Sequence, residues 1–117
     1  MAKEVAAFAR TDVQAGRLRT LGNRPLVVLT ATRPYPEAML AATGLTRAEA
    51  DRMQAIWKVL QAEEASWSTR SRHALVPDSG HYIQDERPDL VIGAVREVIH
   101  TVRADEAQAD ADGQGKE

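Results

Sequence analysis

Residues 26–30, with the sequence LVVLT, form a continuous apolar run that is the clearest strand signal in the chain. The run is rich in β-branched residues, which favour strands. It lacks the alternation of polar and apolar positions that marks a strand with one face in water. A continuous run of this kind is typical of a parallel strand that is buried on both faces of a sheet. A second, shorter run at residues 73–76, followed by a polar turn at 77–80, predicts another strand.

Between these strands, residues 46–66 predict a helix. It opens with Thr46-Arg47-Ala48-Glu49, which fits the capping-box sequence, and apolar residues then recur at a spacing of three or four. Glu64 falls in the same stripe and marks the end of its buried part. The positions predicted to face the core are Ala50, Met53, Ile56, Trp57 and Leu60.

Three further helices are predicted outside this unit. Residues 88–102 open on a proline and carry a one-sided stripe of apolar residues. Residues 37–42 form a short helix with Gly44 as its C-terminal cap, and residues 2–15 form a weak amphipathic helix. In residues 88–102 the stripe consists of Val91, Ala94, Val95, Val98 and Val102. In residues 2–15 it consists of Val5, Phe8, Ala9 and Val13.

The order of the main elements is therefore helix, strand, helix, strand, helix, which predicts an α/β fold. A long helical crossover favours parallel pairing of the two strands with a right-handed connection. Two parallel strands make a poor sheet by themselves, so we expect these strands to join others. The segment 104–117 has no large apolar residue and is predicted to be disordered.

The composition of the chain argues against several classes of function. The 117 residues are 44% hydrophobic with a formal net charge of -2, and no basic patch suggests nucleic acid. The chain has no cysteine, which excludes disulfides and cysteine ligands, and the three histidines lack metal-ligand spacing. No apolar run approaches the ~20 residues that span a bilayer. We expect a cytoplasmic protein without a cofactor, a metal, a membrane partner or a nucleic-acid partner.

Residues 71–89, SRHALVPDSGHYIQDERPD, carry the most specific pattern. A strand ends in a turn at Gly80-His81, and an apolar pair, an acidic-Arg-Pro step and an apolar-striped helix follow. We expect Gly80 to provide a backbone conformation that is closed to other residues. Together with LGNRPLVVLT and the helix at 46–66, this stretch resembles the C-terminal part of the α/β-hydrolase fold: its penultimate strand, crossover helix, last strand, histidine loop and last helix.

The resemblance implies a C-terminal fragment of a Rossmann-like three-layer fold, with two parallel strands and flanking helices. On this interpretation residues 1–20 are an N-terminal helix and linker, a remnant of a cap or inter-strand region. Residues 21–103 are the hydrolase segment, and residues 104–117 are the tail. The family hydrolyses small esters or amides with a Ser-His-acid triad, and His81 would be its general base.

The chain does not contain the rest of that triad. No G-x-S-x-G sequence occurs, so the serine elbow is absent. The acid that usually follows the penultimate strand is also missing, and three sources remain open. Glu37 is the nearest carboxylate, Asp12 is a remote option, and in some members of the family the acid follows an earlier strand. Ser79 lies close to His81, but its ordinary role is to satisfy the turn.

We therefore expect a truncated hydrolase that is inactive alone. The alternatives are a non-catalytic binding or oligomerisation module derived from a hydrolase, and one half of a split enzyme with a complementing chain. Self-association is possible in each case.

His73 is interpreted as a strand residue with a satisfied ring and His100 as a helix-surface residue. Trp57 and Trp67 are interpreted as core residues rather than a ligand platform.

Overall fold

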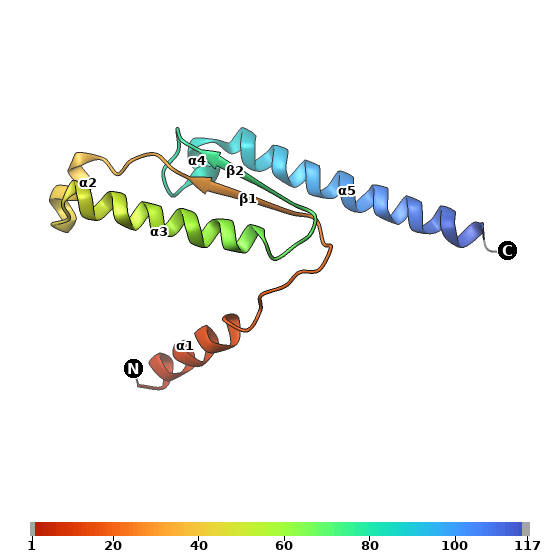
Figure 1. The fold of residues 1–117 in the computed structure, drawn as a ribbon, viewed down its shortest axis with the longest axis horizontal. Coiled ribbons are helices and arrows are strands. Elements are labelled where there is room, and N and C mark those ends of the chain that lie inside the picture. Colours follow the sequence, from red (N-terminus) through yellow and green to blue (C-terminus); the bar gives the residue numbers. More distant parts are fainter. Residues whose placement is uncertain (1, 116–117) are drawn as a thin grey trace.

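The computed structural model describes residues 2–115, with the side chains of residues 2–5 and 8 left out of the description. The described residues form two strands and five helices (Figure 1). In chain order these are α1 (Ala2–Ala15), β1 (Leu26–Ala31), α2 (Glu37–Thr43), α3 (Arg47–Ala65), β2 (Ser71–Val76), α4 (Ile83–Glu86) and α5 (Pro88–Gln114).

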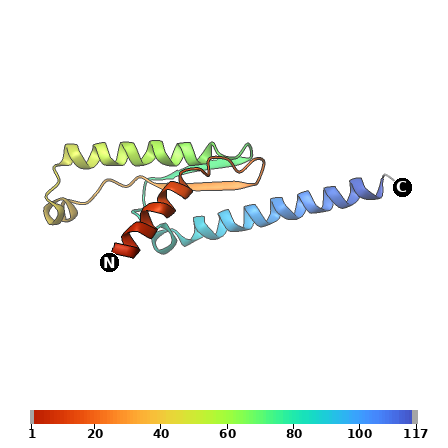
Figure 2. The same ribbon diagram turned by 90° about the horizontal axis from the view of Figure 1, so that it is seen from below.

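The two strands pair in parallel, as predicted, with Leu26 opposite Ser71 and Ala31 opposite Val76. The α/β fold class is thereby confirmed. β2 begins two residues before the predicted residue 73, because Ser71 and Arg72 continue the ladder with exposed side chains. α3 connects the strands and lies on one face of the sheet, while α5 lies on the other (Figure 2). The result is a small three-layer unit.

The outer edge of β1 is open in the described structure. The N–H of Leu26 donates to the carbonyl oxygen of Arg70, just before β2, at 3.2 Å, and the N–H of Thr32 donates to Val76 O at 3.0 Å. Because a parallel ladder uses alternate residues of each strand, the main-chain groups of Val27, Leu29 and Ala31 point away from β2. These groups form a template on which a further strand could pair.

One polar cluster lies between the sheet and α3. Thr30 is fully buried, and its Oγ1 lies 2.7 Å from Nε2 of His73 and 3.5 Å from Oε1 of Gln61. The ring of His73 therefore has a hydrogen-bond partner in the sheet, as predicted. The contact with Gln61 ties the first strand to the middle of α3.

The face that α3 turns to the sheet differs from the prediction. Its buried residues are Ala50 and Ala65, and Gln54 and Gln61 are half-buried on the same face. The predicted apolar stripe lies on the flank instead, where it is exposed: Met53 48%, Ile56 56%, Trp57 44% and Leu60 47%. Small and amide side chains let the helix approach β1 closely, and Trp57 lines a hollow beside Leu29 at the open edge of the sheet.

α3 begins where the capping box predicts. Thr46 is the N-cap, and its Oγ1 accepts a hydrogen bond from the N–H of Glu49 at 3.1 Å. The same hydroxyl contacts the Glu49 carboxylate at 2.9 Å. α2 likewise ends as expected, at Gly44, whose φ of 73° is the left-handed conformation that favours glycine.

α5 is longer than predicted. Val91, Ala94 and Val98 are half-buried against the sheet, in agreement with the predicted stripe, but Val95 and Val102 are exposed. They belong to a second apolar stripe, with Ile92, Val95, Ile99 and Val102 at 38–53% exposure. Since Glu97 points to Arg72 on β2, this opposite flank of α5 lies on the side of β1.

The helix continues to Gln114, so the structure corrects the expected disorder from residue 104 onward as far as residue 115. Alanine, glutamine and glutamate are good helix formers, so the segment needs no core contact to extend a helix that is already nucleated. Arg70 also holds Asp105 at 2.6 Å. Residues 116 and 117 lie outside the described residues.

α1 makes little contact with the unit. Its linker is tied down where Leu21 N–H donates to Trp67 O at 2.7 Å and where Arg19 pairs with Glu63 at 2.6 Å. Of the predicted stripe, Val13 is 60% exposed and Ala9 is also exposed. The side chains of Val5 and Phe8 lie outside the described residues.

The apolar core is small. The buried hydrophobic residues among those described are Val28, Leu40, Ala50, Ala65 and Val76. Two of the five are alanines, so little apolar area is removed from water by the sheet and its helices. No helix in residues 2–115 is both long and apolar enough to cross a membrane.

Candidate functional site

The exit loops of the two strands lie at the same end of the sheet, because the strands are parallel. The loops are joined by main-chain hydrogen bonds. Thr32 N–H donates to Val76 O at 3.0 Å, and Arg33 N–H donates to Ser79 O at 3.2 Å. Residues 77–86, which carry His81, include α4 and are called the histidine loop below, are therefore held against the exit of β1. This is the sheet end where α/β proteins place their sites.

A cleft of about 330 Å³ opens beside these loops. β1, the sheet-facing side of α3 and the histidine loop all contribute to its wall. The lining residues are Leu29, Ala31, Arg33, Tyr35, Gln54, Trp57, Gln61, Gly80, His81 and Ile83. Because Leu29 and Ala31 also present the open edge of β1, the cleft and the unpaired strand edge occupy the same side of the molecule.

His81 is exposed at this cleft. Its ring packs edge-on against Tyr82, with ring centroids 5.1 Å apart and an interplanar angle of 80°. Within residues 2–115, no side chain or main-chain group hydrogen-bonds to the His81 ring. An imidazole in this position can accept and release protons, but nothing in the described chain fixes its tautomer.

The predicted acids lie elsewhere. Glu37 begins α2, pairs with Arg47 at 2.6 Å, and has an 85% exposed side chain that does not line the cleft. Asp12 is exposed on α1. The carboxylate that reaches the histidine loop is Glu86, which Arg33 engages. In the sequence Glu86 belongs to the acidic-Arg-Pro step before the last helix, and no local pattern links it to Arg33.

Ser79 is fully buried, and its hydroxyl donates to Gly80 O at 2.9 Å. Its N–H donates to Val76 O at 3.3 Å and closes the turn. Ser79 therefore satisfies the turn, as expected, and does not present a nucleophile to the cleft. Trp57 differs from expectation, because it lines the cleft at 44% exposure instead of filling the core. Trp67 is half-buried, and His100 is exposed on α5.

Gly80 is crowded, and the crowding is not of the predicted kind. Its φ is not positive, since the positive-φ glycines of the described chain are Gly22 and Gly44. Instead, a Cβ at Gly80 would lie 2.9 Å from Nη2 of Arg33 and 3.3 Å from Oε1 of Glu86. A side chain at position 80 would therefore crowd the Arg33–Glu86 ion pair.

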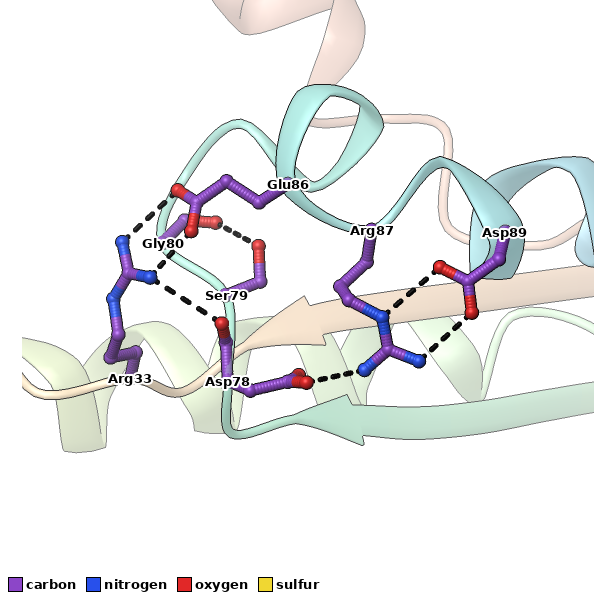
Figure 3. A network of polar contacts seen from close by, with 7 residues as sticks. All are labelled: Arg33, Asp78, Ser79, Gly80, Glu86, Arg87 and Asp89. Atoms are coloured by element: carbon purple, nitrogen blue, oxygen red, sulfur yellow. Dashed lines mark hydrogen bonds and ion pairs between the residues drawn. The ribbon is translucent and has the colours of Figure 1, made fainter.

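Two arginines form the polar network of this loop (Figure 3). Arg33 joins the exit of β1 to Glu86, and Arg87 joins Asp78 in the turn to Asp89 in the first turn of α5. Hydrogen bonds to Asp89, and then to Asp78, raise the pKa of Arg87. The hydrogen bond from Arg87 likewise lowers the pKa of Asp89. The network fixes both ends of the histidine loop.

No protein-family model, curated protein or solved structure matches this chain. The function of the cleft is therefore inferred from the residues that line it. No group of three or more His, Asp or Glu side chains in the described part of the chain could hold a metal ion. The cleft thus offers one exposed imidazole, two half-buried amides and aromatic side chains beside an open strand edge.

Proposed function

We propose that this chain supplies the histidine portion of an α/β-hydrolase-type site that cleaves small esters or amides. One observation carries the proposal. His81 follows the second of two parallel strands and lines a cleft at the open edge of the first. A histidine in that position can serve a nucleophile that a neighbouring strand presents at the same sheet end.

In the proposed site His81 accepts the proton of a serine as the serine attacks the substrate carbonyl. It then returns that proton to the leaving group. The serine belongs to strands that pair with the edge of β1, through the main-chain groups of Val27, Leu29 and Ala31. The acid comes from the same strands, because Glu37 is engaged by Arg47 and lies off the cleft. By itself, this chain is inactive.

The surroundings of the open edge support added strands. Exposed apolar side chains lie on both helices that cover the sheet, including Met53 on α3 and Ile99 on α5, and Trp57 lines the cleft beside Leu29 of the open edge. A strand paired with β1 would lie between the exposed apolar side chains of α3 and those of α5. Both of its faces would then be buried, which is the usual environment of a parallel strand.

The same feature favours a second candidate, a module that binds or oligomerises without catalysis. An open strand edge between two apolar flanks is a surface on which another chain can associate. The two candidates differ in what they require of His81. The hydrolase proposal needs its imidazole, whereas the module needs only the strand edge and the flanks.

The reading frame upstream of Met1 tests the proposal. An in-frame G-x-S-x-G sequence, or a co-purifying chain that contains one, supports the hydrolase site. The decisive assay is turnover of a p-nitrophenyl ester by that assembly. His81→Ala should abolish turnover, and His100→Ala is the matched control because His100 lies exposed on α5. An unrelated upstream gene and no serine-bearing partner would favour the binding module.

A further inference from the structure

Arg33 is the residue at which the exit of β1, helix α3 and the histidine loop meet. Its N–H donates to Ser79 O at 3.2 Å, and its carbonyl accepts from Nε2 of Gln54 at 2.7 Å. The main chain of Arg33 is therefore held on both sides, by the histidine loop and by the helix that lines the cleft. The Cα atom from which the guanidinium side chain extends is thus held in place.

The guanidinium then reaches across the loop to Glu86. Nη2 donates to Oε1 at 3.0 Å, Nη1 donates to Oε2, and Nη1 also lies 3.4 Å from the Asp78 carbonyl oxygen. The pairing is bidentate, which fixes the relative orientation of the two side chains as well as their distance. Asp78 and Glu86 stand at opposite ends of the loop that carries His81, so one arginine closes it (Figure 3).

The pair lies against the main chain of Gly80, the residue before His81. A Cβ there would approach Nη2 of Arg33 to 2.9 Å. The main chain at Gly80 thus has the guanidinium on one side, and Ser79, whose hydroxyl donates to Gly80 O, is fully buried beneath it. Movement of the loop toward Arg33 is blocked, and movement away from it has to open the ion pair.

We infer that Arg33 and Glu86 are positioning residues for His81: their ion pair clamps the histidine loop at the exit of β1, so that His81 lines the cleft. The inference deepens the proposed function and depends on it only for the catalytic meaning of His81. The clamp itself is a property of the described chain and can be tested without any enzymatic activity. Neither residue is proposed to touch a substrate.

The chain offers a matched control for the clamp. Arg72 and Glu97 form a second bidentate pair, between β2 and α5, with their closest atoms 2.6 Å apart. Side-chain exposure is 49% and 41% in that pair, against 45% and 33% for Arg33 and Glu86. The two ion pairs therefore have similar bidentate geometry and similar solvent exposure, but only the Arg33–Glu86 pair lies over the histidine loop.

The test is amide hydrogen exchange on the full chain, with Arg33→Met and Glu86→Gln compared with Arg72→Met and Glu97→Gln. We expect exchange at the amides of Ser79, Asp85 and Arg87, which donate main-chain hydrogen bonds around the histidine loop, to rise about fivefold in the first two variants, the factor that corresponds to the upper end of what an exposed ion pair contributes. The control variants should leave those amides unchanged. Exchange in β1 and α3 should stay near the wild-type rate in all four.

Two further readouts separate positioning from general loss of stability. The nuclear Overhauser effect between the rings of His81 and Tyr82, which are 5.1 Å apart, should weaken in Arg33→Met and persist in Arg72→Met. The exchanged pair, Arg33→Glu with Glu86→Arg, should restore both the ring contact and the slow exchange. If Arg33→Met unfolds the whole chain, Arg33→Lys replaces it and should give an intermediate increase.

The inference is overturned if the amides of Ser79, Asp85 and Arg87 exchange at the wild-type rate in Arg33→Met. It is also overturned if the Arg72 and Glu97 variants accelerate the loop equally, or if the exchanged pair restores nothing. None of these results bears on whether His81 serves a nucleophile. The ester assay with His81→Ala tests that separately, so failure of the clamp and failure of the hydrolase proposal can be distinguished.

Discussion

A single added methyl group at Gly80 tests the packing of the histidine loop. Gly80→Ala places a Cβ 2.9 Å from Nη2 of Arg33 and 3.3 Å from Oε1 of Glu86. The first distance is too short to persist, so the Arg33–Glu86 pair has to move. The obstacle is the end of a flexible side chain, and the cost is therefore the partial loss of an exposed ion pair, at most about 1 kcal/mol.

A second effect opposes this loss. Replacing glycine by alanine at a permitted backbone conformation stabilises by about 0.4–1 kcal/mol, because the unfolded chain becomes less flexible. Since Gly80 does not have a positive φ, that gain applies here. The two effects nearly cancel, and we expect Gly80→Ala to change the free energy of unfolding by less than about 0.5 kcal/mol. Gly80→Val adds further methyl groups and should destabilise by about 1–3 kcal/mol.

Gly93 is the matched control. It lies in α5, and nothing is within 4 Å of a Cβ built on it. Gly93→Ala should stabilise the chain by about 0.8–1 kcal/mol, the difference in helix propensity between the two residues. Urea denaturation followed by circular dichroism measures both variants, with m-values compared to confirm a common transition. If Gly80→Ala is as stabilising as Gly93→Ala, no crowding exists at Gly80 and the reasoning is refuted.

Three further predictions concern activity, association and acid. The chain alone should hydrolyse a p-nitrophenyl ester no faster than its His81→Ala variant, because no serine elbow is present; faster turnover would contradict this. It should self-associate in sedimentation velocity through its apolar flanks, and Ile56→Lys or Ile99→Lys should reduce association without lowering stability. A concentration-independent monomer would count against the open edge. The hydrogen bond from Arg72 lowers the pKa of Glu97, so the resulting stability is fully present above the unfolded-state pKa and is lost as pH falls through the lowered pKa of the folded chain. Glu97→Gln should reduce that loss in an acid titration.

The parallel strands and their helical crossover could be predicted because each has a local signal. A continuous β-branched run predicts a strand buried on both faces, and Thr46 with Glu49 marks the start of α3. The long connection then favours parallel pairing. Since the exit loops of parallel strands meet at one sheet end, the position of His81 beside the exit of β1 followed from the topology.

The helix faces could not be predicted in the same way. The stripe of Met53, Ile56, Trp57 and Leu60 has the period of a core face, yet α3 packs through its alanines and glutamines. Amphipathicity records which side of a helix avoids water, and it does not say which neighbour covers that side. In the described structure the large side chains of α3 are exposed, and Leu60 lines a hollow with Gly16 and Arg19 instead of packing on the sheet.

The ion-pair network also escaped prediction, since it depends on residues far apart in the chain. Arg33 and Glu86 are separated by 53 positions, and only the parallel register brings them together. The end of α5 was missed for a different reason. A segment without large apolar residues was assigned to disorder, although its alanine-rich composition can extend a helix that begins upstream.

The most direct test of the central proposal is ester hydrolysis by the assembly of this chain with a serine-bearing segment, whether that segment is encoded upstream of Met1 or belongs to a separate chain. We expect p-nitrophenyl ester turnover that is abolished by His81→Ala and retained in His100→Ala. Turnover that survives His81→Ala, or an assembly through the β1 edge that contains no serine nucleophile, would contradict it.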